Sequence, residues 1–207
     1  MATNGIFSIV KKGTALVAAA VLVLLASHVA LAQVPAGMDI PANLPKLEGP
    51  VAITTIGQAP GLVQVGLLLK QLKVDVYSDD FLEAKDLVGK GYKVLILNMG
   101  TSLKGMGAAG VDLDSEIARC DQLVAEARKQ GMFIIGAQIE GLKRRTDEYD
   151  ERSNKAVTAV ADLLLIRSEI DHDSFFTNVA KQRNIPIIRT KEALDFKYAL
   201  GVLFGVN

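Results

Sequence analysis

The chain of 207 residues contains one cysteine, two histidines and no tryptophan. A single thiol cannot form a disulfide within the chain, so the fold has to be stabilised by burial of apolar surface. Because His28 lies in an apolar N-terminal stretch, the rest of the chain offers only His172 and Cys120 as nitrogen or sulfur ligands. Two such ligands are too few for a zinc site, and we expect no bound metal.

The chain also lacks a net charge, because 23 basic residues balance 23 acidic ones. A nucleic-acid-binding domain normally carries an excess of basic residues, so we expect no nucleic-acid partner. Charged residues make up 22% of the chain, beside 18 glycines and six prolines. This composition is typical of a globular protein and excludes a disordered or collagen-like polymer.

The N-terminal 32 residues have the layout of a secretion signal. A polar start ends in two lysines, an apolar stretch follows from Gly13 to Leu25, and Ala30-Leu31-Ala32 offers the small residues that a signal peptidase requires. We therefore expect cleavage after Ala32 and a periplasmic or otherwise extracytoplasmic location. The alternative is that residues 13–32 stay uncleaved as a membrane anchor, which would then be the only contact with a membrane.

A proline-rich segment follows the expected signal. Residues 33–50 carry four of the six prolines and show no amphipathic period. This pattern predicts an extended linker over residues 33–49 and a single folded domain over residues 50–207.

From residue 51 onward, short apolar runs alternate with stretches of helical periodicity. The expected strands are Val51–Ile56, Val74–Tyr77, Val94–Leu97, Phe133–Ile135, Leu163–Ile166 and Ile185–Ile188. The expected helices are Leu62–Leu72, Phe81–Val88, Asp114–Gln130, Asp147–Ala161, Asp173–Arg183 and Lys191–Phe204. Near-continuous apolar strands are typical of a parallel sheet that is covered on both faces. The alternation predicts an α/β fold with a three-layer, doubly wound, mostly parallel six-stranded sheet, of the flavodoxin-like or Rossmann-like kind.

The helical pattern also places the single cysteine. Ile117, Cys120, Val124 and Ala127 are spaced by three or four residues and share one helix face. We expect Cys120 to pack against the sheet as a small apolar residue; a reactive thiol would need an exposed, electropositive setting.

Residues 98–110, after the third strand, form the most informative predicted loop. Twelve or so residues without structure of their own exceed a routine strand-to-helix connection and are typical of functional loops. The glycines of this loop would let backbone N–H groups converge on an anion, and Lys104 supplies positive charge. The alternative is a flexible cover loop that ends in Asp112 and Asp114, which we interpret as helix caps rather than metal ligands.

Lys143, Arg144 and Arg145 form the densest cationic cluster of the predicted domain. They follow the fourth strand and precede a helix, so the arginines could clamp a carboxylate or phosphate. The alternative is a surface of ion pairs with nearby acidic residues, which contributes little to stability.

Motifs for nucleotide binding and for serine catalysis are missing. No Gly-Lys-Ser/Thr opens a helix, no G-x-G-x-x-G follows the first strand, and no G-x-S-x-G follows any strand. Asp171-His172-Asp173 is interpreted as a turn with a helix cap. We expect no cofactor, and the sequence leaves open whether the chain is an enzyme.

Four sequence blocks resemble a family of exported bacterial domains of unknown function. The blocks are TTIGQAPG (Thr54–Gly61), KGMGAAGVDLD (Lys104–Asp114), EGLKRRTDEYD (Glu140–Asp150) and DHDSFFTNVA (Asp171–Ala180). The resemblance covers the domain from about Pro50 to Phe204 and implies no activity. It implies that a shared pattern includes Gly57, Gln58, Lys104, Gly105, Gly107, Asp112, Arg144 and Arg145.

These observations favour a domain that binds an anionic or polar small molecule at the carboxyl ends of the strands, where open α/β sheets bind their ligands. The expected binding residues are Gly57, Gln58, Asn98, Thr101, Ser102, Lys104, Gly105, Gly107, Arg144 and Arg145. The hypothesis requires the loop around Lys104 and the two arginines to converge on one rim of the sheet.

Two other functions stay open. A cofactor-independent hydrolase or transferase would use Glu140, Asp112 or His172 as its acid or base. A scaffold protein would act through the apolar last helix, which would bind a protein partner or a second copy of the chain.

Overall fold

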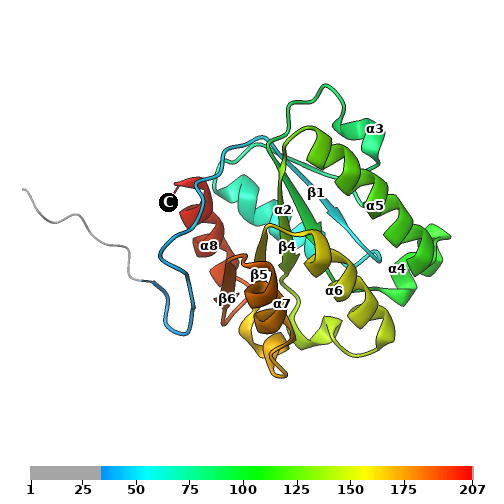
Figure 1. The fold of residues 1–207 in the computed structure, drawn as a ribbon. Coiled ribbons are helices and arrows are strands. Elements are labelled where there is room, and N and C mark those ends of the chain that lie inside the picture. The colour runs from blue at the N-terminus through cyan, green and yellow to red at the C-terminus, as the bar shows by residue number, and fades with distance from the viewer. Residues whose placement is uncertain (1–33, 207) are drawn as a thin grey trace, which may run out of the picture. The chain divides into compact units, whose positions relative to one another are not determined.

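The computed structural model describes residues 34–206, which form a six-stranded sheet covered by helices on both faces (Figure 1). The expected signal segment lies outside the described residues. Every strand pairs in parallel with its neighbours, in the order β2-β1-β3-β4-β5-β6. The strands are β1 (Val51–Thr55), β2 (Val76–Ser78), β3 (Val94–Asn98), β4 (Phe133–Gln138), β5 (Leu163–Arg167) and β6 (Ile187–Thr190). The predicted fold class is confirmed.

Helices cover the sheet on both sides. They are α2 (Gly61–Gln71), α3 (Ala84–Leu87), α4 (Leu103–Ala109), α5 (Leu113–Lys129), α6 (Glu148–Val160), α7 (Phe175–Arg183) and α8 (Asp195–Phe204), with short 3₁₀ turns at Gly141–Arg144 and Ser168–Asp171. Residues of α2 and α8 share one apolar cluster, and residues of α3, α5, α6 and α7 share the other. Among the described residues, no helix has both the length and the apolar character that crossing a membrane requires.

Strand β3 shows why the apolar runs become central strands. Val94 and Ile96 point into the α2–α8 cluster, whereas Leu95 and Leu97 point into the opposite one. Successive side chains of a strand face opposite sides of the sheet, so a strand buried on both faces has to be apolar at every position. Asn98 ends this run at the carboxyl edge and is itself fully buried.

The proline-rich segment packs on the domain, although an extended linker was predicted. Asp39 and Arg189 exchange two backbone hydrogen bonds of 2.9 Å, which adds a short antiparallel bridge beside β6. Further along, the Leu47 N–H donates to the carbonyl oxygen of Leu203 at 2.8 Å, and Leu47 is buried in the α2–α8 cluster. Apolar residues between the prolines therefore attach the segment to the sheet, and this was not apparent from its lack of periodicity.

For the loop after β3, one expectation was wrong and another is confirmed. The loop was expected to lack structure, but it contains α4, which Ser102 caps by accepting a hydrogen bond from the Gly105 N–H at 3.1 Å. Asp112 caps α5 as predicted, accepting from the Ser115 N–H at 2.8 Å. Asp114 lies in the first turn of α5 and forms an ion pair with Arg152.

Candidate functional site

The order of the strands defines where a ligand site is expected. The chain runs from β1 outward to β2 and then returns past β1 to β3, so the strand order reverses between β1 and β3. Open α/β sheets bind ligands at this reversal, outside the carboxyl ends of the strands. The loops after β1 and β3 are therefore the first candidates.

These two loops are packed directly against each other. The Ser102 N–H donates to the Gly57 carbonyl oxygen at 2.7 Å, and Gln58 forms an isolated bridge with Thr101. Gly57 has a φ of +100°, and a Cβ there would lie 2.6 Å from the Thr101 methyl group. The absence of a side chain at Gly57 thus lets the two loops pack against each other.

Thr101 is held from below by a buried carboxylate on α6. Asp150 Oδ1 accepts from the backbone N–H and from the hydroxyl of Thr101, both at 2.8 Å. The second oxygen, Oδ2, accepts from the N–H of Thr146 at 2.9 Å and from its hydroxyl at 3.2 Å. Asp150 thereby ties the loop after β3 to the start of α6.

Arg144 reaches the loop after β3, as predicted, but its charge is already paired. Its Nε donates to Glu140 Oε1 at 2.9 Å and its Nη1 donates to the Thr101 carbonyl at 2.7 Å. The other carboxylate oxygen of Glu140 accepts from the Gly61 N–H at 2.9 Å, at the start of α2. A carboxylate of the protein itself therefore lies at this helix N-terminus, a place that favours negative charge.

Arg145 points away from Arg144 and is nearly buried, with 5% of its side chain exposed. It forms ion pairs with Glu151 at 2.7 Å and Asp173 at 2.6 Å, and its guanidinium lies 5.6 and 5.3 Å from the ring centres of Phe175 and Phe176. These contacts join α6 to α7 and use the guanidinium for the fold. The two arginines do not converge on one ligand.

The hydrogen bonds from Arg145 lower the pKa of Asp173 well below its usual range. A carboxyl group whose folded pKa is lowered stabilises the fold above its unfolded pKa of about 4, and this contribution is lost as the pH falls. We expect the stability difference between the natural protein and Asp173→Asn to be largest near neutral pH and to shrink below about pH 4. Urea unfolding at several pH values measures it, with the exposed Glu148→Gln as a control. A difference that stays constant with pH would refute the assignment.

The remaining predicted residues are divided between the loop contact and the surface. Gly105 packs against Gln58, because a Cβ there would lie 2.8 Å from the Gln58 carbonyl oxygen. Lys104 and Gly107 are exposed on α4. Asn98 ends β3 as a fully buried residue whose Oδ1 has no hydrogen-bond partner among the described residues. The structure thus brings together the loops after β1 and β3 with Arg144, and it leaves Arg145 elsewhere.

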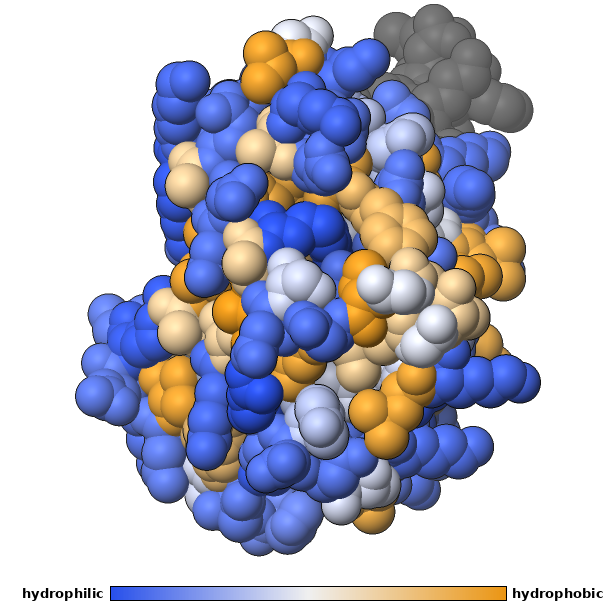
Figure 2. All heavy atoms as spheres, turned by 90° about the vertical axis from the view of Figure 1, so that its right-hand side faces the viewer, coloured by the Kyte–Doolittle hydropathy of each residue, from blue (hydrophilic) through white to orange (hydrophobic). Residues whose placement is uncertain are grey.

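An open cavity of about 670 Å³ lies next to this loop contact, between the start of α3 and the first half of α5. Figure 2 looks onto this side of the molecule, where a hydrophilic floor lies in a hollow that apolar side chains border. The lining residues are Phe81, Glu83, Ala84, Lys85, Val111, Ser115, Glu116, Ala118, Arg119 and Gln122. None of the ten predicted binding residues lines this cavity.

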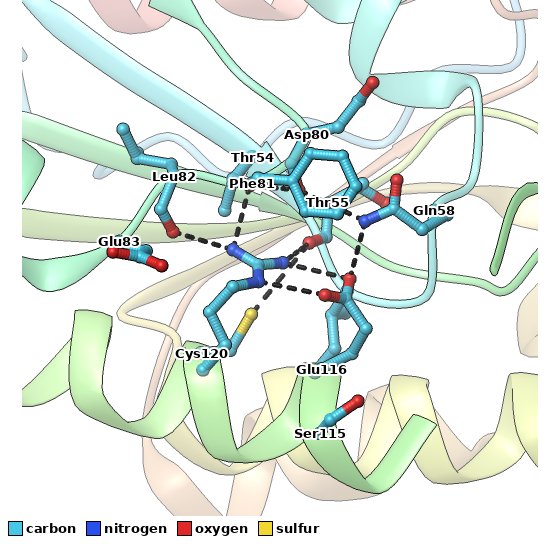
Figure 3. A network of polar contacts seen from close by, with 12 residues as sticks. Thr54, Thr55, Gln58, Asp80, Phe81, Leu82, Glu83, Ser115, Glu116 and Cys120 are labelled. Atoms are coloured by element: carbon cyan, nitrogen blue, oxygen red, sulfur yellow. Dashed lines mark hydrogen bonds and ion pairs between the residues drawn. The ribbon is translucent and has the colours of Figure 1, made fainter. Parts of the chain in front are cut away.

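The floor of the cavity is a buried ion pair, Glu116–Arg119, on α5 (Figure 3). The Arg119 Nε and Nη2 each donate to Glu116 at 3.0 Å. The guanidinium also donates to the carbonyl oxygens of Thr55 at 2.6 Å and Leu82 at 2.7 Å. Because Thr55 ends β1 and Leu82 precedes α3, the pair fixes the walls of the cavity relative to the sheet.

Glu116 also holds the loop after β1. Its Oε2 accepts from the Gly57 N–H at 3.2 Å and from the Gln58 Nε2 at 2.9 Å. Gln58 has a backbone φ of +60°, a value that residues other than glycine rarely adopt. Such strained positions persist only where the surroundings fix them, and they gather at functional sites.

The Glu116–Arg119 pair was missed by the sequence analysis, although a signal was present. Glu116 lies four residues before Cys120 and seven before Leu123, so it belongs to the buried face of α5. A carboxylate at a core position of an amphipathic helix needs a partner, and Arg119 is the adjacent candidate at i+3. Neither residue is apolar, so the spacing of the apolar side chains alone does not reveal the pair.

The candidate acids, bases and nucleophiles either have structural partners already or lie apart from the cavity. Asp112 caps α5, Glu140 is paired with Arg144, and His172 is exposed with its Nδ1 3.4 Å from the Glu169 carbonyl oxygen. Cys120 is buried in the apolar cluster of α3, α5, α6 and α7, which confirms its predicted packing role. This burial raises the pKa of the thiol to about 12. Within residues 34–206, no three His, Cys, Asp or Glu side chains are grouped to hold a metal ion.

Comparison with known proteins gives a family and distant structural similarities. The model of a family described as "Domain of unknown function (DUF6305)" matches residues 48–204. No curated protein matches the chain.

Three solved structures overlap the chain with low scores. A GDSL-like lipase from Bacteroides thetaiotaomicron VPI-5482 is 9% identical with a TM-score of 0.36, over 67% of this chain and 66% of the lipase, just under two thirds of its length. A flavodoxin from the domain Archaea is 14% identical with a TM-score of 0.35, over 75% of this chain and 97% of the flavodoxin. A truncated 3-deoxy-D-arabino-heptulosonate 7-phosphate synthase from Thermotoga maritima is 13% identical with a TM-score of 0.32. The overlap covers 78% of this chain and 48% of the synthase. Similarities of this size carry no information about activity.

Proposed function

The chain belongs to the DUF6305 family of domains of unknown function, and from this starting point we propose that it is an extracytoplasmic domain that binds a small molecule in the α3–α5 cavity. The observation that carries the proposal is the cavity itself, about 670 Å³ in volume and built on a fixed polar floor. Pockets for small molecules have volumes of roughly 300–1,000 Å³.

The position of the cavity supports the same proposal. Arg119, on its floor, contacts Thr54 and Thr55 at the carboxyl end of β1 and Leu82 beyond β2. Ligands of open α/β sheets bind outside these carboxyl ends. Since the loops after β1 and β3 fill the gap at the reversal, the open space beside it is the best place for a ligand.

A rigid floor also favours binding, because a site that is formed before the ligand arrives does not have to be ordered on binding. Arg119 has 13% and Glu116 2% of its side chain exposed, and both are held by several hydrogen bonds. The cavity therefore needs little rearrangement to accept a molecule.

The extracytoplasmic part of the proposal rests on the apolar N-terminal stretch and Ala30-Leu31-Ala32. Fractionation of cells that express the full chain, with mass determination of the product, tests it. We expect an exported product that begins at Gln33. Full-length protein retained in the cytoplasm would contradict this part of the proposal without affecting the cavity.

Filling the cavity tests the binding function directly. Ala118 lines the cavity from α5, and Ala125 is exposed two turns further along the same helix without lining it. We expect Ala118→Phe to abolish the retention of small molecules that co-purify with the exported protein, as measured by native mass spectrometry. Ala125→Phe is the matched control and should retain them. Equal retention by both variants would refute the cavity as the site.

A further inference from the structure

We propose that the ligand of the α3–α5 cavity is uncharged and presents an apolar ring to Phe81. This inference rests on the proposed function and names the chemical class of its ligand. The lining groups that remain free to bind a ligand determine this class.

Arg119 has no donor left for an anion. A guanidinium has five N–H bonds. The Nε–H donates to Glu116 Oε1, and the two Nη2–H bonds serve Glu116 Oε2 and the Thr55 carbonyl oxygen. Nη1 donates to Thr54 Oγ1 at 3.3 Å and to the Leu82 carbonyl oxygen at 2.7 Å. An anionic ligand would have to break one of these buried contacts, and so the cation on the floor does not attract it.

Glu116 is equally committed against a cation. Its Oε2 accepts three hydrogen bonds, from Gly57, Gln58 and Arg119, and its Oε1 accepts one from Arg119. The adjacent guanidinium compensates its charge. A cationic ligand at this floor would therefore be repelled by Arg119 as much as it is attracted by Glu116.

At the mouth, the charges are exposed to water and offset each other, with 75% of the Lys85 side chain and 52% of the Glu83 side chain exposed. Lys85 is paired with Glu83 at 2.5 Å, and the Glu83 side chain also takes part in the capping box of α3. Ser115 donates to the Asp112 carbonyl at 2.8 Å and accepts from the Asp112 N–H at 3.2 Å. A charged ligand would lose water in the cavity without gaining an unpaired counter-charge, and that exchange is unfavourable.

What the cavity leaves free is apolar surface and one amide. Phe81, Ala84, Val111 and Ala118 line it, and Gln122 is exposed on α5. Phe81 keeps 47% of its surface exposed, while its backbone N–H is fixed by Asp79 Oδ1 at 2.8 Å. A large exposed aromatic on a fixed backbone is suited to stack on the ring of a ligand. An uncharged ring with one polar edge toward the amide matches these groups.

A series of probes with one ring and three charges tests the inference. Indole is neutral, indole-3-acetate is an anion and tryptamine is a cation near neutral pH. We expect calorimetric titration to show that indole binds with a millimolar or lower Kd, about tenfold more tightly than either charged probe. Its affinity should not change with ionic strength, because no net charge is involved. Phe81→Ala should weaken indole binding at least fivefold, whereas Tyr149→Ala, which removes an exposed aromatic ring on α6 outside the cavity, should not.

The outcomes separate the inference from the function on which it rests. Tighter binding of either charged probe, abolished by Ala118→Phe, would overturn the inference and leave the binding function in place. The absence of indole binding at millimolar concentration would also overturn it. A co-purifying molecule that survives Ala118→Phe would instead overturn the proposed function.

Discussion

Replacing Glu116 with alanine is expected to lower the free energy of unfolding by about 3–5 kcal/mol. The substitution leaves the guanidinium of Arg119 largely buried without its counter-charge. It also removes the acceptor for the Gly57 N–H and for the Gln58 amide, which fix the loop after β1. Breaking a buried pair by removing one partner is costly, because the remaining charge stays out of water.

The same helix offers a matched control. Glu126 and Lys129 form a second pair with the same i, i+3 spacing, at 3.4 Å, but Lys129 is 78% exposed. We expect Glu126→Ala to cost less than about 1 kcal/mol, as exposed ion pairs do. Urea unfolding followed by far-ultraviolet circular dichroism measures both, since the chain has no tryptophan to report by fluorescence.

A double substitution distinguishes loss of the pair from loss of a charge. Glu116→Met combined with Arg119→Met removes both charges and keeps most of the volume, so it should destabilise less than Glu116→Ala alone. If Glu116→Ala lowers the free energy of unfolding no more than Glu126→Ala does, the Glu116–Arg119 pair does not hold this part of the fold together.

The layered fold could be predicted because its cause is local in the sequence. Strands such as β3 are buried on both faces and have to be apolar throughout, and the segments between them keep a helical period. The order of the strands and the attachment of Leu47 to the α2–α8 cluster depend on contacts between distant segments. No periodicity in a single sequence encodes them.

Helix α4 shows how tertiary packing overrides local preference. Glycines disfavour helix formation, so a segment with Gly105 and Gly107 was expected to be a loop. In the structure Gly105 packs on the Gln58 carbonyl oxygen, where a Cβ would lie 2.8 Å away. The glycine that weakens the helix is thus the residue that lets it approach the loop after β1.

The candidate site was predictable in its location and only partly in its residues. The carboxyl edge of the sheet follows from the α/β pattern, and Arg144 does reach the loop after β3. Adjacent residues at the end of a 3₁₀ turn point in different directions, and Arg145 therefore faces Asp173 instead. Glu116 did not stand out among the candidates, because attention to apolar residues passes over a carboxylate, although its spacing places it on the buried face of α5.

Replacing Asp150 with alanine is expected to lower the free energy of unfolding by about 2–4 kcal/mol. The carboxylate is 2% exposed and accepts four hydrogen bonds, two from Thr101 and two from Thr146. Without it, the buried N–H and hydroxyl of Thr101 have no acceptor. A buried donor without an acceptor destabilises the fold by its full desolvation free energy.

Hydrogen exchange of the Thr101 amide provides a readout that a general loss of stability would not reproduce. In Asp150→Ala we expect this amide to exchange faster than those of β3, because its acceptor is gone while the pairing of β3 with β1 and β4 remains. Glu148→Ala, at an exposed position of α6, is the control and should change stability by less than about 0.5 kcal/mol. If Thr101 stays as protected in Asp150→Ala as in the natural protein, another acceptor replaces the carboxylate. In that case the loop after β3 does not depend on α6 for its position beside the cavity.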